Sequence, residues 1–546
     1  MSTENHFECN CDSAKGLKYK DLSIIYMQIF TLKFEDLKKH IKTEKFMELD
    51  PESKKYMVEV VEEEDKEESI DNQIFIYGAN KNLIRRYKLP NFTVIIQLIK
   101  PYPVRLECEM HVEMSLFFNQ TISMTYRMVI DDEIQKSSEF ITTDHIISLI
   151  SLASSAEHWH MKEGDVCSDA IASISGKTPE LSIKNLVLNS DGAWSDDRAK
   201  NCGSLYTGNH LIEVFDRYRE RVRQICGDSR RASDGKKHQK FEETGTIYTY
   251  VDIWESLQHY DGLFEEMVKE NKEEDIISHI AKYHKKELVG LMSLYPAEWP
   301  YRTIESFDDI CGENAAIDTD DLIYVGHNVC VVLGTYGLRG GVNAPTKWKE
   351  ILNSTRKKHH VSWPEYMLIL EMILAKKHTI EYANDYLLES VISENAFENP
   401  TKSVEENAKL NLNITKLISK LDAVKYSKFV SHKVMFDKTS KRLRINEARA
   451  KLDETIERLD NSLNTIRDAE SLKLSSGLKN LLAIISIISL AQIVFNKTEI
   501  PFLEFIGVNW HNIFAVILEM MIAIFILGSV IYFFVDKKVR RSRGYK

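Results

Sequence analysis

Uncharged residues gather in two long stretches near the end of the chain, and these give the strongest pattern in the sequence. Residues 481–495 (LLAIISIISLAQIVF) contain no charge and lie within a segment of twenty residues, 477–496. The second stretch, 513–535, is interrupted only by Glu519. A hydrocarbon core about 30 Å thick needs roughly 20 helical residues. The pattern therefore predicts two transmembrane helices, 477–496 and 513–535, joined by an outer loop over 497–512.

Basic residues lie on one side of this predicted hairpin. The tail over 536–546 carries six Lys and Arg, whereas the loop 497–512 carries one Lys and two Glu. Because positively charged flanks stay in the cytoplasm, both termini are expected there, in a multi-pass protein of the inner (cytoplasmic) membrane. The N-terminus has no charged-then-apolar signal segment, in line with that topology. The alternative, a buried helical hairpin of a soluble domain, fits stretches of this length less well.

Polar residues recur at helical spacing within the first stretch. Four of them are 3, 3 and 4 positions apart: Ser486, Ser489, Gln492 and Asn496. They fall within an arc of about 120° on a helix. Small polar residues often pack transmembrane helices together, which is one interpretation. The other is a pore lining, formed when several copies bring this face to a common axis. A helical stalk that leads into this stretch favours the pore lining.

An acidic residue stands inside the second stretch. Glu519 lies about 9 Å along the helix axis from Ile513. An unpaired carboxylate at mid-depth costs roughly 2.5–3.5 kcal/mol, so such a residue indicates a functional site. A hydrogen bond from Gln492 or from His511 is expected to satisfy it.

The stalk is predicted over 401–476, where almost nothing stops a helix. Between Pro400 and Pro501 there is no proline, and the only glycine is Gly477. A narrow apolar seam with gaps of 3 or 4 crosses its charged second half, and this seam predicts a coiled coil or helix bundle. The seam consists of Ile445, Ala448, Leu452, Ile456, Leu459, Leu463, Ile466 and Ala469.

The first half of the stalk has similar spacing at Ile414, Leu417, Leu421 and Val424. It is a candidate antiparallel partner for the second half, with a turn near 435–439. A helix that enters the bilayer without a break can transmit rotation or tilt from a cytosolic domain to a pore.

The region before the stalk is predicted to be a cytosolic α/β or α+β domain in two parts, 1–240 and 241–400. Short apolar runs predict strands within 74–131, and 104–112 alternates between apolar and polar residues. A turn over 117–121 predicts a hairpin. Helical spacing and one strongly apolar run place the remaining elements: helices over 145–154, 211–225, 270–294 and 361–395, and a strand over 322–333.

Two segments are candidates for binding an anion. In the glycine-rich segment 334–352, glycine backbone N–H groups and charged side chains favour a phosphate, with candidate ligand-binding residues Gly337, Arg339, Gly340 and Lys347. The alternative is a plain strand-to-helix turn. The second segment is an arginine series, for which a solvated face is the favoured interpretation: Arg217, Arg219, Arg221, Arg223, Arg230 and Arg231.

Composition narrows the classes of function. The chain has 546 residues and a formal net charge of −11, which disfavours direct nucleic-acid binding. Its eight cysteines show no repeated C-x2-C spacing, which fits a reducing compartment and predicts no metal site. His158 and His160, like the pair His359 and His360, lack the spacing of a helical zinc pair, and no hydrolase motif occurs. The chain is therefore not expected to be an enzyme.

A cytosolic domain, a long helix into the first of two C-terminal spans, a short loop and a basic tail together resemble the CorA-like divalent-cation channel superfamily. The stretch LKNLLAIISIISLAQIVFN is similar to the membrane entry of those proteins, and the resemblance covers roughly the last 150 residues. That family ends its first span with a Gly-Met-Asn triplet that binds hydrated magnesium. This chain has Val494, Phe495 and Asn496 there, so only Asn496 matches and Mg²⁺ selectivity is in doubt.

Members without the triplet include CorA-like effectors of type III CRISPR systems, which respond to a nucleotide second messenger and compromise the membrane. The resemblance implies a homo-oligomer of five copies, whereas the stalk seam also allows a tetramer. The expected function is an ion channel in antiviral defence, opened by a small anionic ligand of nucleotide type. The alternatives are a constitutive Mg²⁺ or divalent-cation transporter and a membrane-tethered enzyme.

Overall fold

The computed structural model describes part of the chain. The longer described segments are 17–31, 83–98, 101–119, 121–130, 141–153, 170–174, 246–256, 284–294, 307–316, 321–334, 363–392 and 429–497. Shorter pieces are 58–59, 301, 359–361 and single positions within 211–223 and 412–427. The chain divides into two compact units, Met1–Asp385 with Leu412–Asp453, and Tyr386–Asn411 with Glu454–Lys546.

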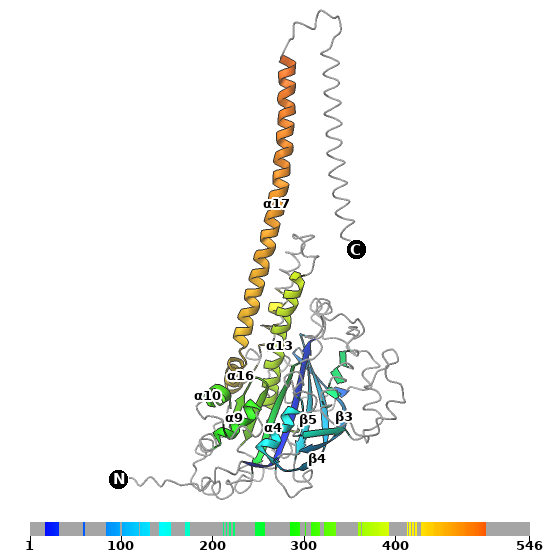
Figure 1. Cartoon of the computed structure of the whole chain (residues 1–546), viewed down its shortest axis with the longest axis vertical. Helices are drawn as coiled ribbons and strands as arrows, with labels where there is room; N and C mark the ends of the chain where they lie inside the picture. Colours follow the sequence, from blue (N-terminus) through cyan, green and yellow to red (C-terminus); the bar gives the residue numbers. More distant parts are fainter. Residues whose placement is uncertain are drawn as a thin grey trace, which may run out of the picture. The chain divides into compact units, whose positions relative to one another are not determined.

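One large sheet organises the first unit (Figure 1). Its strands run in the order β2-β3-β4-β5-β1-β8-β10-β9, with β6 paired to β1 and β7 to β3. Among the described pairings, only β8 with β10 is parallel. The strands are β1 (Lys18–Thr31), β2 (Val58–Glu59), β3 (Ile84–Leu98), β4 (Val104–Phe117), β5 (Thr121–Ile130), β6 (Ile141–Thr142), β7 (Ala170–Ile174), β8 (Thr246–Ser256), β9 (Asp321–Val325) and β10 (Val329–Gly334).

The predicted α/β character and the predicted hairpin are confirmed. β4 and β5 pair antiparallel on either side of a turn at 118–119, and the first residues of β4 alternate between buried and exposed. Part of the predicted strand region, 74–79, lies outside the described residues. The strand predicted over 322–333 is wrong in one respect. It is a hairpin of two strands, β9 and β10, because the chain turns at 326–328.

Neither β1 nor β8 is among the predicted strands, although both lie in the middle of the sheet. β8 follows residue 240 in the sequence, yet it pairs with β1 from the N-terminal part. Strands from both sides of residue 240 therefore belong to the same sheet.

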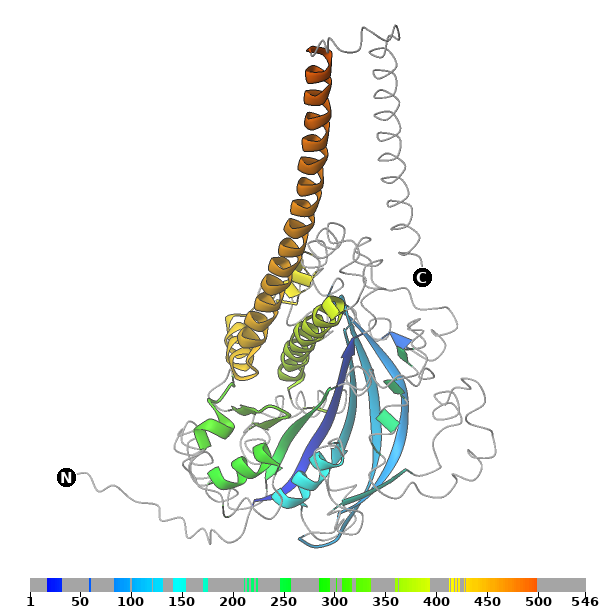
Figure 2. The same ribbon diagram turned by 45° about the horizontal axis from the view of Figure 1, so that its top comes forward.

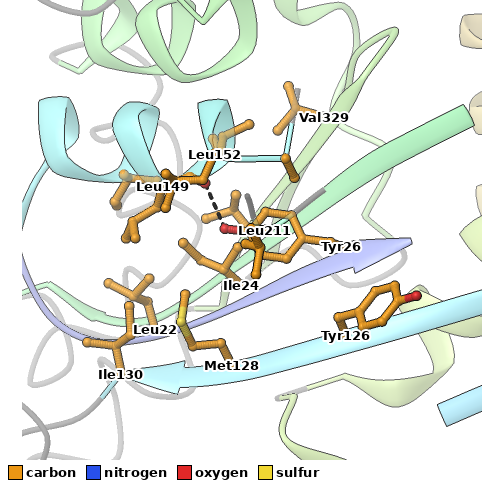
Figure 3. Packing of buried hydrophobic residues seen from close by; sticks show 14 of the residues in the cluster. Leu22, Ile24, Tyr26, Tyr126, Met128, Ile130, Leu149, Leu152, Leu211 and Val329 are labelled. Carbon is orange, nitrogen blue, oxygen red and sulfur yellow. Dashed lines mark hydrogen bonds between the residues drawn. The ribbon is translucent and has the colours of Figure 1, made fainter. Parts of the chain in front are cut away.

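One face of the sheet carries the main hydrophobic core. Helix α4 (Thr143–Ser151) packs there, and the Tyr26 hydroxyl donates to the Leu149 carbonyl oxygen at 2.7 Å (Figure 3). Described helical positions within 211–223 cover the same face, and the Phe215 ring stacks on Tyr126 with centroids 3.8 Å apart. Burying aromatic rings on this scale contributes strongly to the stability of the sheet.

Helix α13 (Pro364–Ile392) lies along the opposite face (Figure 2). Three of its side chains reach strand residues or their neighbours: Glu371 bonds Arg86, Thr379 bonds Thr121, and Tyr366 bonds Asp321. The two shorter helices near the β9 end are α9 (Lys285–Ser293) and α10 (Phe307–Cys311).

The second half of the predicted stalk is helical. Helix α17 runs from Ile445 to Lys497 without a break, and the boundary between the two units falls within it. The predicted turn near 435–439 is wrong, because helix α16 (Val430–Arg442) passes through these positions. The chain turns instead at Leu443 and Arg444, where Arg444 has a φ of 57°.

In the part of the chain that the structure describes, no helix is long and apolar enough to cross a membrane. The second predicted span, Glu519, His511, the outer loop beyond Lys497 and the basic tail lie outside the described residues.

Candidate functional site on the sheet face beneath α13

Polar side chains line the sheet face that α13 covers. Residues alternate between the two faces of a strand, so the register decides which ones meet there. His111 lies opposite Arg127, Glu113 lies opposite both Lys88 and Thr125, and Ser115 lies opposite Arg86. A row of charged residues from β3, β4 and β5 therefore shares the face with Glu371 of α13.

Two buried ion pairs form the centre of this polar layer. Arg127 Nη2 lies 2.6 Å from Glu113 Oε2, and Arg86 Nη2 lies 3.1 Å from Glu371 Oε2. The Arg127 and Glu371 side chains are 2% and 0% exposed. A buried charge without a partner lowers the stability of the fold, so the two members of each pair must stay together. One pair therefore joins β4 to β5, and the other joins β3 to α13.

Electrostatics in the layer follow from burial and from the neighbouring charges. Burial raises the pKa of Glu113, but the positive charges of Arg127 and Arg86 outweigh it and hold that pKa below its ordinary value. Burial lowers the pKa of Arg127, although Glu113 opposes this change. The Glu113 carboxylate is therefore held ionised beside the two guanidinium groups.

A bulge in β3 places a polar group at the rim of this layer. The register between β3 and β4 shifts between Leu89 and Phe92, where Pro90 supplies no N–H for the ladder. Asn91 takes over part of the pairing, because its Oδ1 accepts from the Val112 N–H at 3.3 Å. Its Nδ2 lies 3.1 Å from both Glu109 Oε1 and His111 Nδ1, and so orients the imidazole.

Two stacked imidazoles complete the rim. The rings of His111 and His360 are 3.7 Å apart and 12° from parallel. His360 has a φ of 58°, in the left-handed region that a residue with a side chain seldom adopts. The preceding carbonyl oxygen, on His359, accepts from Arg127 Nη1 at 2.9 Å. Strain of this kind concentrates at functional sites, so the rim is the strongest candidate for one.

Several buried polar atoms on this face have no hydrogen-bond partner. They are Ser123 Oγ, Arg127 Nε, Tyr250 Oη and Glu371 Oε1. Each such atom costs about 1–3 kcal/mol when it stays unsatisfied, so native structures hold few of them. Three of them offer an N–H or O–H donor, and the fourth is a carboxylate acceptor. The layer thus keeps three donors and one acceptor that its own hydrogen bonds and ion pairs do not use.

Acidic groups mark the far end of the same face. The Tyr366 hydroxyl donates to Asp321 Oδ2 at 2.8 Å, and Asp252 lies buried on the neighbouring strand β8. Burial raises the pKa of Tyr250 well above its ordinary value, and the charges of Asp252 and Asp321 add to the rise. The phenol of Tyr250 therefore stays protonated. No group of three or more His, Cys, Asp or Glu that could hold a metal ion occurs among the described residues.

The predicted anion-binding residues Gly337, Arg339, Gly340 and Lys347 lie outside the described residues. Gly334, where the segment 334–352 begins, is described, and so are residues 359–361, seven positions after its end. The segment leaves β10 at Gly334, which pairs with Asp321, and the described chain resumes at 359–361, on the rim beside Arg127 and His111. The described residues nearest the segment on either side therefore lie at the sheet face that carries the polar layer.

The arginine series was interpreted as a solvated face, and that interpretation is wrong for the two described members. Arg219 and Arg223 are each only 5% exposed, and Arg223 lies over the Phe30 ring at 5.4 Å from its centroid. They are four positions apart, so they share one face of their helix and point into the protein. The other members, 217, 221, 230 and 231, lie outside the described residues.

Two of the predicted pore-lining residues have described side chains. The Ser486 and Ser489 hydroxyls are exposed and donate to the carbonyl oxygens of Leu482 and Ile485, one turn earlier, at 2.8 and 2.9 Å. Their hydroxyl hydrogens are thereby satisfied within the helix, which suits either a packing surface or a pore lining. Gln492 and Asn496 lie on the helical backbone of α17, and their side chains are outside the described set.

The polar layer contains residues that the sequence pattern does not single out as a site. His359 and His360, which lack the spacing of a helical zinc pair, lie against the polar layer. Arg86, Glu113, Arg127 and Glu371 are not among the predicted site residues. Glu113 gave no signal, because it continues the alternation of apolar and polar residues in β4. Arg127 gave a weak one, because it is the only charged residue in the strand Thr121–Ile130. Glu371 gave a similar one, a single acid within an apolar helical run.

Comparisons with known proteins return no neighbour: no family model, no curated protein and no solved structure matches this chain.

Proposed function

We propose that this chain forms a homo-oligomeric channel of the CorA-like type, opened by a small anionic ligand that binds its α/β part. The observation that carries the proposal is the continuity of α17. A single helix holds both the charged, seam-bearing segment after Ile445 and the uncharged residues 481–495. A rigid helix of this kind transmits movement along its axis, whereas a broken one would absorb it.

The polar layer supports the choice of the ligand's location. It presents buried donors on Arg127, Ser123 and Tyr250, and the described residues nearest the glycine-rich segment, Gly334 and 359–361, lie at its face. Glycine backbone N–H groups and arginine side chains are the usual partners of a phosphate. We therefore propose that the ligand binds at the rim near His360, with Arg339 and Lys347 as candidate phosphate partners. A nucleotide second messenger has the required charge.

Gating requires that the ligand bind the open state more tightly than the closed state, because equal affinity for both would shift nothing. The buried ion pair between Arg86 and Glu371 joins the sheet to α13, so a ligand that competes for either charge would alter this contact. Ion flux or membrane disruption is the expected output, and antiviral defence is the expected setting.

The test is ion flux through the purified full chain in liposomes. A fluorescent probe of K⁺ or Mg²⁺ inside the vesicles reports flux as nucleotide probes are added, beginning with ATP, cyclic di-AMP and cyclic tetra-adenylate. The expected result is flux that rises with one of these. Flux that is the same with and without every nucleotide contradicts ligand gating. Selective Mg²⁺ uptake that closes at high Mg²⁺ would favour the transporter instead.

The pore lining is tested by substitution along α17. Ser489→Leu and Gln492→Leu should lower flux by about tenfold or more if these side chains face the ion path, because an apolar group there raises the barrier. Ser462→Leu is the matched control, since Ser462 is exposed on the same helix before the uncharged stretch. Equal flux through all three variants would assign Ser489 and Gln492 to helix packing.

A further inference from the structure

Two cationic side chains of α16 donate to backbone carbonyl oxygens in α10, in β9 and in the segment between them. Arg442 Nε donates to the Val325 carbonyl oxygen at 3.0 Å, and its Nη2 donates to the Asp309 carbonyl oxygen at 2.7 Å and to that of Ile310. Lys438 Nζ donates to the Asn314 carbonyl oxygen at 2.9 Å. A single guanidinium group thus joins the end of β9 to the last turn of α10.

The segment that receives these bonds is itself held in place. The Asn314 side chain accepts from the Ala316 and Ile323 N–H groups at 3.0 and 2.8 Å. Gly312 has a φ of 73°, and a Cβ at this position would lie 3.3 Å from Arg442 Nε. The Tyr248 hydroxyl lies 2.9 Å from the carbonyl oxygens on both sides of the β9–β10 turn, those of Gly326 and Val329. The backbone that α16 contacts at this edge of the sheet is therefore held in place by hydrogen bonds of its own.

The elbow between α16 and α17 comes directly after Arg442. The Leu443 N–H donates to the Thr439 carbonyl oxygen at 2.9 Å, and Arg444 then turns the chain with its positive φ. The first turn of α17 closes at once, because the Ala448 N–H donates to the Arg444 carbonyl oxygen at 3.0 Å. The position of the Arg442 backbone therefore sets where α17 begins.

We infer that Arg442 is a positioning residue that fixes the start of α17 to the β9 end and the α10 end of the sheet domain, so that these parts move as one body. β9 also carries Asp321, which bonds Tyr366 of α13 at the candidate site. A change at that site consequently reaches α17 through β9 and the Arg442 guanidinium. Lysine cannot replace it, because a single ammonium lacks the planar fork that reaches three carbonyl oxygens.

The inference is tested by hydrogen–deuterium exchange of the full chain in detergent micelles, read peptide by peptide. Arg442→Gln should speed exchange by about tenfold or more in two separate segments, 307–316 and 443–452, because it removes bonds from a charged donor to both. Peptides of β3, β4 and β5 should keep their wild-type rates. Arg442→Lys should resemble Arg442→Gln.

Two further variants keep the result specific. Lys441→Gln removes a neighbouring charge whose distance to Glu313 is 3.9 Å and whose side chain is 83% exposed, so it should leave both segments unchanged. Gly312→Ala keeps Arg442 but crowds its guanidinium, and it should loosen the same two segments to a smaller extent. Faster exchange throughout the sheet, in only one segment, or nowhere would overturn the role.

The inference rests on the proposed function only for its effect on gating. In liposomes, Arg442→Gln should keep the nucleotide dissociation constant within about twofold and lower ligand-driven flux by about tenfold, because coupling rather than binding is lost. If the wild-type chain conducts with no nucleotide, the proposed function fails, while the exchange experiment still decides the role of Arg442.

Discussion

Arg127 and Glu113 form a diagonal ion pair across β4 and β5, with Arg127 Nη2 2.6 Å from Glu113 Oε2 and the arginine side chain 2% exposed. Arg127 reaches past its direct neighbour His111 to make this contact. It also donates to the His359 carbonyl oxygen, and so brings the rim and the strands together.

Removing one partner of this pair should be costly. Arg127→Met leaves the Glu113 carboxylate buried without its nearest positive charge, which typically costs about 3–5 kcal/mol of unfolding free energy. Chemical denaturation of the full chain, followed by tryptophan fluorescence, measures the change. Lys441→Gln, at an exposed pair, is the control and should change stability by less than about 1 kcal/mol. A small loss for Arg127→Met would mean that Arg86 alone compensates Glu113.

Stability should fall as the pH drops below about 6.5, in part through His111. Burial lowers its pKa, Glu109 opposes this, Arg127 adds to the lowering and Glu113 opposes it. The pKa of His111 is thus lower in the folded chain than in the unfolded chain. Protonation of His111 at acidic pH therefore favours the unfolded chain and lowers the free energy of unfolding.

His111→Phe preserves the stack on His360 but cannot bind a proton. The slope of unfolding midpoint against pH, measured between pH 7.5 and 5, should therefore be smaller in this variant than in the wild type. An unchanged slope would show that other groups carry the whole pH dependence.

Two buried tyrosines should respond differently to loss of the hydroxyl group. Tyr26 donates to the Leu149 carbonyl oxygen at 2.7 Å, so Tyr26→Phe should cost about 0.5–1.5 kcal/mol (Figure 3). Tyr250 Oη is equally buried and has no hydrogen-bond partner, so Tyr250→Phe should be neutral or stabilising. Thermal unfolding of both variants measures this difference. A clear loss for Tyr250→Phe would indicate a bound polar group on the face beneath α13.

The elbow at Arg444 should be improved by glycine. Its φ of 57° costs an L-residue roughly 1–2 kcal/mol, and glycine avoids most of this cost. Arg444→Gly should therefore stabilise the fold by up to about 1 kcal/mol. Arg458→Gly, in the regular part of α17, should destabilise it by about 1 kcal/mol. Denaturant midpoints of the two variants should move in opposite directions, and a shared direction would contradict strain at the elbow.

The sequence predicts those elements in which apolar and polar positions recur in a regular pattern. The first residues of β4 alternate between buried and exposed positions, and α17 has a seam with nothing to break it, so both patterns are visible in the chain. β1 and β8 give no such signal, because they lie between other strands with both faces buried. Buried residues therefore follow one another along most of both strands, and no alternation marks one face as the exposed one.

Local pattern thus determined that the chain mixes strands with helices and that a long helix, α17, includes the uncharged residues 481–495. Only the tertiary structure decided which residues form the candidate site. Arg86 and Glu371 are 285 positions apart and meet because strand register and the placement of α13 bring them to one face. The turn at Arg444 could not be predicted from the sequence either. Arg442 fixes it by donating to backbone carbonyl oxygens, and because every residue has a carbonyl oxygen, the sequence does not show which ones accept.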